Sequence, residues 1–382
     1  MLEAIREKVL RGERLGFEDG LALFNEPDVL AVGQLANQVR EARHGDRTYF
    51  NRNLRIEVTN VCVASCLFCS FAKLEEHMPG AHTMTLEQAW KKFEEARAAG
   101  VAPTEVHIVN GLHPGLPFSY YEDLLRGFKR IDPTVHLKCF TAVEIHFFAQ
   151  HYGMTHREVL ERLRAAGLDS LPGGGAEIFD EDVRRRISPD KATASEYLEV
   201  HRIAHQMGMR SNVTMLYGHI ETFAHRVDHL LRVRELQDET KGFQAFIPLA
   251  FHPDGNGMKK LPAPTAMDDL RTIAVSRLML DNVDHIKAYW VSLTPDVAQI
   301  ALRFGADDID GTIVHETIYK AAGSRSPDGL SYDELVRLIR EAGRTPVERD
   351  TLYNVVREHP KARAPEAAMK VRDRKRALEV VS

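Results

Sequence analysis

From Tyr49 onward, short runs rich in β-branched and aromatic residues alternate with amphipathic helical segments, and this alternation constrains the fold more than any other feature. Such alternation is typical of parallel strands joined by helical crossovers. About eight strand–helix units in roughly 300 residues fit a closed (β/α)8 barrel of the TIM type. Because the fourth strand is very short, a partial barrel of about six units is the alternative. The predicted strands are Leu54–Thr59, Glu105–Asn110, Val135–Phe140, Ser170–Leu171, Arg210–Leu216, Phe243–Ile247, His285–Tyr289 and Asp307–Asp310.

The helices predicted between these strands carry apolar residues at the spacing of one helix face. Several are followed by a glycine, which readily adopts the left-handed conformation that ends a helix. They are Leu86–Ala98, Tyr120–Ile131, His156–Ala166, Ser195–Gln206, Arg226–Gln237, Asp268–Leu280 and Asp296–Phe304.

The chain divides into three regions on these patterns. Residues 1–48 have helical spacing and predict an N-terminal helical extension, and residues 49–345 hold the barrel. Residues 346–382 predict a C-terminal extension. Its last stretch, Lys361–Ser382, is rich in Lys, Arg and Ala and predicts an exposed tail helix.

Composition excludes several classes of protein. A net charge of −5 and a pI near 6.4 do not favour a nucleic-acid partner. The sequence contains no run of about 18 apolar residues, so we expect no membrane span. The charged N-terminus lacks the apolar core of a secretory signal. Three of the four cysteines are clustered, which does not suit a disulfide framework and predicts a protein of the reducing cytoplasm.

The clustered cysteines, Cys62, Cys66 and Cys69, have the spacing C-x3-C-x2-C. Three thiolates can hold a [4Fe-4S] cluster while leaving one iron free to bind a small chelating molecule. Buried or zinc-binding cysteines are the alternative. The spacing, together with Phe68 before the third cysteine, resembles the radical S-adenosylmethionine (SAM) enzymes. That resemblance implies that the amino acid end of SAM occupies the open iron.

Polar residues follow the predicted strands, at the end of a barrel where active sites lie. The cysteine loop follows the first strand, which places it at the same mouth. The other polar strand ends are Asn110-Gly111-Leu112-His113-Pro114, Thr141-Ala142-Val143-Glu144, Pro172-Gly173-Gly174-Gly175-Ala176-Glu177, Tyr217-Gly218-His219-Ile220-Glu221 and Phe251-His252-Pro253.

Three of these strand ends are predicted to bind SAM. The resemblance implies main-chain contacts from Asn110 and Gly111 to the methionine amino group; a tight turn is the alternative. Glu144 could accept hydrogen bonds from ribose hydroxyls or the ammonium group, or it could stabilise a helix N-terminus. The glycine string with Glu177 favours close approach to a ligand over a flexible connection. The residues predicted to bind cofactor are Phe68, Asn110, Gly111, Glu144, Gly174, Gly175 and Glu177.

Histidines and one carboxylate supply the predicted catalytic groups. His219, Glu221 and His113 could perform acid–base or orienting work, and a structural role at the strand ends is the alternative. Cys139 lies within a strand and is predicted to be a small core residue. His201 and His205 are predicted to lie on a solvated or packed helix face.

Longer strings narrow the resemblance to the aminofutalosine synthases of the futalosine route to menaquinone, over about residues 50–355. The cyclic dehypoxanthinylfutalosine synthases and the tyrosine-using half of deazaflavin synthase share the cysteine loop and the glycine string, and they are the alternatives. The strings that carry the resemblance are TNVCVASCLFCSF, VNGLHPGLPFSYYEDLLR, VHLKCFTAVEI, SLPGGGAEIF, SNVTMLYGHIET, FIPLAFHP, RLMLDNVDHIKAYW, FGADDIDGT and ERDTLYNVV.

This resemblance implies a transferase that uses SAM as a cosubstrate. A 5′-deoxyadenosyl radical adds to 3-[(1-carboxyvinyl)oxy]benzoate, and aryl migration and loss of bicarbonate give 6-amino-6-deoxyfutalosine. It also implies a one-electron donor of the flavodoxin or ferredoxin type. The alternative functional class is a non-enzymatic binding protein in which the cluster is structural or transfers electrons. The candidates for binding the two substrate carboxylates are Arg210, His219, His252, Lys287 and Arg349.

Overall fold

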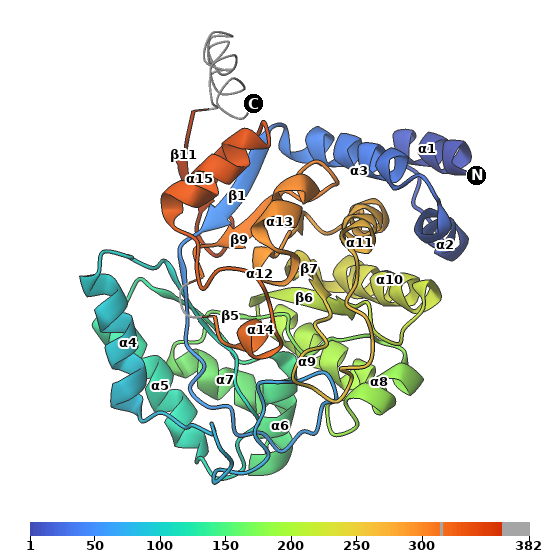
Figure 1. Cartoon of the computed structure of the whole chain (residues 1–382). Coiled ribbons are helices and arrows are strands. Elements are labelled where there is room, and N and C mark those ends of the chain that lie inside the picture. The colour runs from blue at the N-terminus through green and yellow to red at the C-terminus, as the bar shows by residue number, and fades with distance from the viewer. Residues whose placement is uncertain (314–315, 361–382) are drawn as a thin grey trace, which may run out of the picture.

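The computed structural model describes residues 1–313 and 316–360, so the predicted tail helix Lys361–Ser382 lies outside the described residues. Three helices precede the first strand: α1 (Leu2–Leu10), α2 (Phe17–Asn25) and α3 (Val29–His44). Helices α2 and α3 pack along α10 (Phe223–Thr240) and α11 (Ala266–Met279), on one flank of the molecule, and α1 packs against α2 and α3 (Figure 1). None of the described helices is both long and apolar enough to cross a bilayer.

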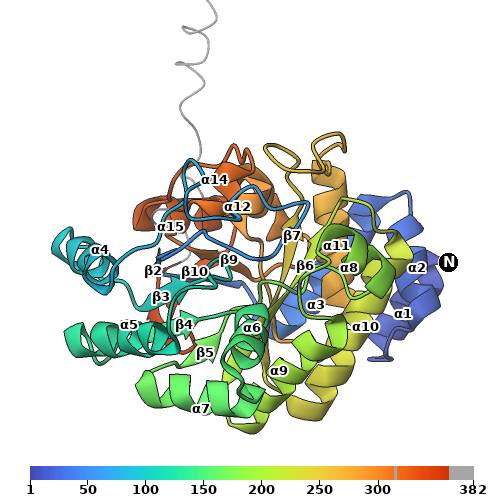
Figure 2. The same cartoon turned by 90° about the horizontal axis from the view of Figure 1, so that it is seen from below.

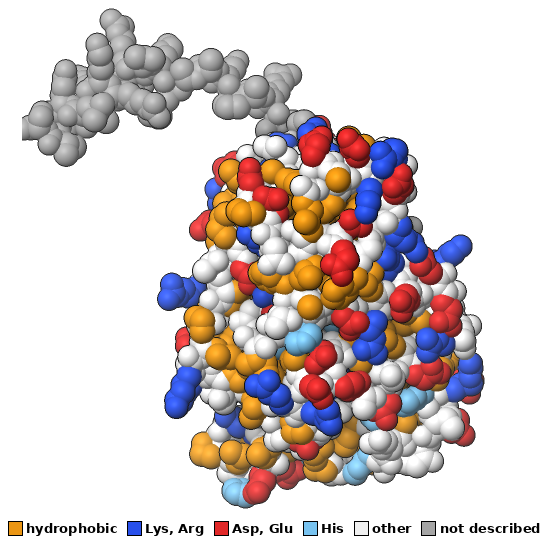
Figure 3. All heavy atoms as spheres, turned by 90° about the vertical axis from the view of Figure 1, so that its right-hand side faces the viewer, with side chains coloured by type: hydrophobic (Ala, Val, Ile, Leu, Met, Phe, Trp, Pro, Cys, Tyr) orange, Lys and Arg blue, Asp and Glu red, His pale blue; other side chains and the backbone are white. Residues whose placement is uncertain are grey.

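The outer face of this flank carries interspersed acidic and basic side chains (Figure 3). Arg14, which follows α1, pairs with Asp238 at 2.5 Å and with Asp281 at 2.7 Å. These exposed ion pairs join the N-terminal extension to the ends of α10 and α11 and contribute little to stability individually.

Seven parallel strands form the larger sheet, in the order β2-β3-β4-β5-β6-β7-β8. Strand order follows chain order, as it does when each strand is returned by a helix on the outside. The strands are β2 (Asn53–Arg55), β3 (Glu105–Ile108), β4 (His136–Cys139), β5 (Ser170–Leu171), β6 (Arg210–Tyr217), β7 (Phe243–Ala250) and β8 (His285–Ile286).

A second sheet closes the first into a ring. Its order is β11-β10-β1-β9, formed by β1 (Arg47–Asn51), β9 (Asp308–Gly311), β10 (Thr345–Arg349) and β11 (Val355–Glu358). Lys287, just after β8, bridges to Asp308 of β9, β9 pairs with β1, and β1 continues through Arg52 into β2. With β1 and β2 counted as one position, the described strands close at eight positions. The predicted (β/α)8 barrel is confirmed.

The helices surround the strands, with α4, α5, α7, α9, α10 and α11 following one another around the outside (Figure 2). The remaining helices are α4 (Leu86–Ala98), α5 (Phe118–Ile131), α6 (Ala142–Tyr152), α7 (His156–Ala166), α8 (Glu181–Ile187), α9 (Ala194–Gln206), α12 (Trp290–Leu293), α13 (Pro295–Ala301), α14 (Ile318–Ala321) and α15 (Tyr332–Glu341). Hydroxyl N-caps explain where many begin, because the side chain accepts a hydrogen bond from a free N–H of the first turn. These caps are Thr85, Thr141, Thr155, Thr193, Thr222, Thr265, Thr294 and Ser331.

The first strand differs from its predicted range. The ladder begins at Arg47, and Leu54–Thr59 contributes only its first two residues to β2. Thr48, Tyr49 and Phe50 favour a strand and pair with β10 on one side, while Tyr49 also pairs with β9. Beyond Arg55 the chain leaves the ladder and approaches the cysteine loop.

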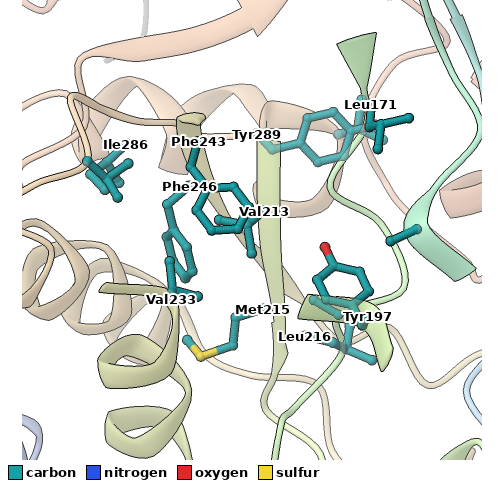
Figure 4. Close-up of a cluster of buried hydrophobic side chains, with 14 of the residues drawn as sticks. Leu171, Tyr197, Val213, Met215, Leu216, Val233, Phe243, Phe246, Ile286 and Tyr289 are labelled. Carbon is teal, nitrogen blue, oxygen red and sulfur yellow. The ribbon is translucent and has the colours of Figure 1, made fainter. Parts of the chain in front are cut away.

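The core between sheet and helices includes apolar residues of neighbouring strands. Val213 and Met215 of β6, with Phe243 and Phe246 of β7, are all buried and lie close together (Figure 4). This packing fixes the direction in which the intervening polar strand residues face, toward the barrel axis.

Arg349 is the last residue of β10, but its side chain reaches Asp308, the first residue of β9, although the sequence offered it as a carboxylate-binding residue. Its Nε donates to Asp308 Oδ2 at 2.6 Å, and neither side chain is exposed. It therefore joins β10 to β9 across the ring and has its own carboxylate partner.

We expect Arg349→Met to lower the free energy of unfolding by about 3–5 kcal/mol, because it leaves the buried Asp308 carboxylate without its partner. Urea denaturation followed by circular dichroism measures this. The double variant Asp308→Asn/Arg349→Met removes both charges and should recover part of the loss. A loss below about 1 kcal/mol in Arg349→Met would show that the pair is not important to the ring.

Candidate active site

A cavity opens at the C-terminal ends of the strands, and the cysteine loop forms part of its wall. Cys62, Cys66 and Cys69 all line it, together with residues in or just after β3, β4, β5, β6, β7, β8 and β9. The predicted cluster ligands therefore meet the polar groups of the barrel in this cavity.

The cysteine loop is held by backbone hydrogen bonds to four different segments. These anchors explain how an irregular loop keeps its shape at the mouth, since they give several of its backbone groups a hydrogen-bond partner. The bonds run from Cys62 N–H to Lys73 O (2.8 Å), from Val63 N–H to Leu112 O (3.0 Å), from Leu67 N–H to Ile187 O (2.8 Å) and from Gly257 N–H to Leu67 O (2.8 Å).

The cysteine side chains suit a metal cluster. All three are free thiols, and burial raises the pKa of Cys62 and raises that of Cys66 to about 12. A bound iron ion reverses this preference, because its charge stabilises the thiolate. Three thiolates facing one cavity fit a [4Fe-4S] cluster with one open iron. The fourth cysteine, Cys139, is fully buried within β4, as predicted for a core residue.

Gly111 lies directly against the cysteine loop. A Cβ atom at this position would be 2.2 Å from Val61 O, so only glycine allows the approach. The side chain of Asn110 contacts the segment just before the cysteine loop, where its Oδ1 accepts a hydrogen bond from Val58 N–H at 2.8 Å. Both residues line the cavity.

Glu144 combines the two roles considered for it. It is the third residue of α6, and its Oε2 accepts a hydrogen bond from Thr141 N–H at 2.8 Å. Its Oε1 accepts from the backbone and side-chain amides of Asn110, each at 3.2 Å. Burial raises the pKa of Glu144 to about 7, and the carboxylate lines the cavity.

The glycine string is packed between β6 and α6. A Cβ at Gly173 would be 2.8 Å from Val213 Cα, and one at Gly175, whose φ is +90°, would be 2.5 Å from Val143 Cγ2. Close packing therefore requires glycine here, and the string also lines the cavity.

Glu177 ends this string in the left-handed conformation, with φ of +47°. Lys191 Nζ donates to its Oε1 at 2.7 Å and lies 5.1 Å above the centre of the Phe68 ring. Burial alone would lower the pKa of Lys191, but the neighbouring Cys66 and Glu177 raise it above its ordinary value. The pair therefore brings a retained positive charge beside the cysteine loop.

The three predicted catalytic residues lie behind the cavity wall. His219 Nδ1 is 3.2 Å from Glu221 Oε2, and both side chains are fully buried. Glu221 also accepts hydrogen bonds from Gly218 N–H and from Arg226 Nε. These contacts tie the end of β6 to α10 and favour the structural alternative.

His113 stabilises the turn that follows it in the chain. Its Nδ1 accepts hydrogen bonds from the N–H groups of Gly115 (3.0 Å) and Leu116 (3.2 Å). His201 and His205 share Ser211 Oγ as a hydrogen-bond partner, which agrees with the packed alternative predicted for their helix face.

The fold places some of the candidate carboxylate-binding residues in the cavity and others outside it. His252 and Lys287 line the cavity. Arg210 lies at the N-terminal end of β6, where it is exposed and donates to Lys241 O. Only the residues at or near the strand C-termini can reach a bound ligand.

A polar layer inside the barrel was missed by the sequence analysis, apart from Lys287. Arg55, His107 and Lys138 stand side by side in register on β2, β3 and β4, and all three line the cavity. A charged residue inside an otherwise apolar strand was the available signal, since a parallel strand is normally apolar on both faces. The other members of this layer are Glu105, Asn212, Lys287, Tyr289 and Asp310.

Charges within this layer are paired across strands. Lys138 Nζ donates to Glu105 Oε2 at 2.7 Å, and Lys287 Nζ donates to Asp310 Oδ1 at 3.0 Å. Burial alone would raise the pKa of Glu105, but the charge of Lys138 holds it below its usual range. Burial lowers the pKa of His107 to about 4, so this imidazole is neutral.

Comparison with solved structures supports the fold. The chain superposes on the FeFe-hydrogenase maturase HydG from Carboxydothermus hydrogenoformans with a TM-score of 0.72 at 17% identity, covering 92% of this chain and 80% of that one. For methylornithine synthase (PylB) the TM-score is 0.70 at 18% identity, with 90% and 97% covered.

Sequence comparisons identify the family. The radical SAM superfamily profile matches residues 56–233, and the CofH/MqnC C-terminal region profile matches residues 240–363. The chain is 50% identical over 359 residues to the aminodeoxyfutalosine synthase of Thermus thermophilus, covering 92% of this chain and 95% of that protein. It is 47% identical over 369 residues to the aminodeoxyfutalosine synthase of Streptomyces coelicolor, with 93% and 94% covered. It is 36% identical to the cyclic dehypoxanthine futalosine synthase of Halalkalibacterium halodurans, with 93% and 95% covered. The chain therefore belongs to the aminodeoxyfutalosine synthase family of the radical SAM superfamily, as its cysteine loop and strand-end strings predicted.

Proposed function

We propose that this chain joins the adenosyl group of SAM to 3-[(1-carboxyvinyl)oxy]benzoate and releases 6-amino-6-deoxyfutalosine. The observation that carries the proposal is one cavity lined both by three free cysteines and by the polar layer of the barrel. With water, the two substrates give the product, methionine, bicarbonate and a proton. The electron used to cleave SAM is recovered when the carboxylate is lost, so the reaction is balanced without a further oxidant.

Cys62, Cys66 and Cys69 would hold the [4Fe-4S] cluster. When bound, the cluster supplies the single electron that cleaves SAM to methionine and a 5′-deoxyadenosyl radical. The loop exposes Val63 and Leu67 by 43% and 44%, beside the cysteines. A one-electron carrier of the flavodoxin or ferredoxin type could approach the cluster there.

The residues around the mouth would bind SAM. Glu144 offers a carboxylate to the ribose hydroxyls or the ammonium group, and Gly174 and Gly175 leave space for close backbone approach. Asn110 and Gly111 lie against the cysteine loop, where the methionine end would be bound. Phe68 and Glu177 frame the same side through their contacts with Lys191.

The apolar wall between mouth and floor would protect the radical. Val109, Leu112, Leu216, Ile247 and Leu249 line this wall. Aliphatic side chains exclude water and carry no S–H or phenolic O–H group that would readily give up a hydrogen atom to the adenosyl radical before it reaches the vinyl carbon.

We expect Cys66→Ala to abolish both iron binding and activity, because two thiolates cannot hold the cluster. Iron analysis and the visible absorption of the anaerobically reconstituted protein measure this. Cys139→Ala is the matched control and should retain full iron at a cost of about 1 kcal/mol in stability. Full iron in Cys66→Ala, or lost iron in Cys139→Ala, would contradict the assignment of the ligands.

Glu144→Gln should weaken SAM binding about ten- to a hundredfold, as expected for the loss of a charged hydrogen bond. The fold should survive, because Gln88 occupies the equivalent capping position of α4. Since the pKa of Glu144 is raised to about 7, the carboxylate becomes charged as pH rises through that value. Wild-type affinity should therefore increase between about pH 6 and pH 8, whereas that of Glu144→Gln should not. Isothermal titration calorimetry measures both, and identical pH profiles would remove Glu144 from the SAM site.

Label in the ribose of SAM should appear in aminodeoxyfutalosine when the enolpyruvyl benzoate is supplied. An adding enzyme retains the adenosyl carbons in its product, whereas the related hydrogen-abstracting enzymes release 5′-deoxyadenosine with each turnover. Mass spectrometry of the nucleoside products separates the two outcomes. Tyrosine and dehypoxanthinylfutalosine should not stimulate turnover. One-for-one release of 5′-deoxyadenosine with a substrate-derived product would assign the chain to the sibling reactions.

A further inference from the structure

The cations that line the cavity differ in how they are used. Lys138, Lys191 and Lys287 each donate a hydrogen bond to a carboxylate at 2.7–3.0 Å. Arg55 does not share this arrangement. Its Nε is buried without a hydrogen-bond partner among the described residues, and its Nη2 is 3.9 Å from Asp310 Oδ2, beyond hydrogen-bond distance.

Tyr289 presents a second unused donor beside Arg55. The Arg55 guanidinium carbon lies 5.1 Å from the centre of the Tyr289 ring. The Tyr289 hydroxyl is buried, and it too lacks a hydrogen-bond partner within residues 1–313 and 316–360. Both side chains line the cavity. A buried polar group without a partner is costly, so two such donors at one cavity wall indicate a ligand that accepts hydrogen bonds.

The carboxylates near Arg55 have other partners. Asp310 accepts a hydrogen bond from Lys287 at 3.0 Å, and Glu316 accepts one from Tyr319 N–H at 3.0 Å. Glu57, whose pKa burial raises to about 7, accepts one from the Thr317 hydroxyl at 3.2 Å. They compensate the charge of the guanidinium from a distance, and they leave its hydrogen-bonding edge available. A guanidinium with a free edge matches a carboxylate group, which can accept two parallel hydrogen bonds.

We propose that Arg55, with the Tyr289 hydroxyl, binds the ring carboxylate of the enolpyruvyl benzoate. This assignment rests on the function proposed above. It names a pair of residues that determines which enol ethers the enzyme accepts. The neutral His107, in register beside Arg55, adds no competing positive charge.

Two considerations select the ring carboxylate over the enolpyruvyl carboxylate. Arg55 precedes the cysteine loop along the same strand, so it lies deeper in the barrel, and the reacting vinyl carbon must face the cysteines. The ring carboxylate is the anionic group remote from that carbon. The enolpyruvyl carboxylate leaves as bicarbonate, and a strong ion pair to it would stabilise the ground state more than the transition state of its loss.

Steady-state kinetics with two substrates tests the assignment. We compare the enolpyruvyl benzoate with the enolpyruvyl ether of phenol, which lacks only the ring carboxylate. Arg55→Gln should raise KM for the benzoate about ten- to a hundredfold and leave KM for the phenol ether within about twofold. Tyr289→Phe should give the same pattern with a smaller effect, about three- to tenfold.

Two controls keep the test decisive. Tyr121→Phe removes another buried hydroxyl without a described partner, but this tyrosine lies in α5, away from the cavity lining, and neither KM should change. Iron content and SAM cleavage assayed without the second substrate, each compared with the wild-type protein, report the integrity of Arg55→Gln. If Arg55→Gln does not fold, Tyr289→Phe alone still distinguishes the two substrates.

The outcomes separate this inference from the function on which it rests. An unchanged KM for the benzoate in the Arg55 and Tyr289 variants would overturn the inference, as would an equal rise for both substrates. If instead the wild-type protein cleaves SAM but converts neither enol ether, the proposed function itself fails, whatever the variants do.

Discussion

Pairing of buried charges between neighbouring strands is the interaction on which the rest of the structure depends. Lys138 on β4 pairs with Glu105 on β3, and Lys287 after β8 pairs with Asp310 on β9. A buried ion without a partner would be neutralised or would destabilise the fold. Because these pairs cross from strand to strand, they allow the barrel to have a polar interior and also hold the strands in register.

The same pairing explains why Arg55 differs from the lysines that line the cavity. Charges that satisfy one another inside the barrel are part of the scaffold, and they reach a ligand only by giving up a partner. Within the described part of the chain, Arg55 lacks such a hydrogen bond. In a wall of matched charges, the residue with unused donors is the one that remains available for chemistry or recognition.

Much of the fold could be predicted from periodicity and glycine stops, because parallel strands and crossover helices leave regular patterns in a sequence. Ser170–Leu171 and Leu86–Ala98 were predicted with their observed bounds. The helix α6 was not among the predicted helices, and a helix start was considered there only as the alternative role of Glu144, which forms the capping box of α6 with Thr141. A cap and a binding site use the same residue types at the same place.

The site was predicted only in part, for a geometric reason. The cysteines could be placed because their spacing alone specifies a shared loop. His219 and Glu221 follow a strand as a catalytic pair would, yet their side chains turn outward to Arg226. Sequence position locates a residue at the mouth of the barrel, but the direction of its side chain depends on packing with elements that are distant in the chain.

The closure of the ring gives the barrel a definite order of assembly. Asn53 accepts a hydrogen bond from Ile313 N–H across 260 residues, and β1 pairs with strands still further along the chain. Contacts of such high sequence separation form slowly, since the loop entropy must be overcome before they contribute. During synthesis from the N-terminus, the cysteine loop therefore emerges long before the barrel can close. Until β9 and β10 have been made, β1 lacks both of its partner strands.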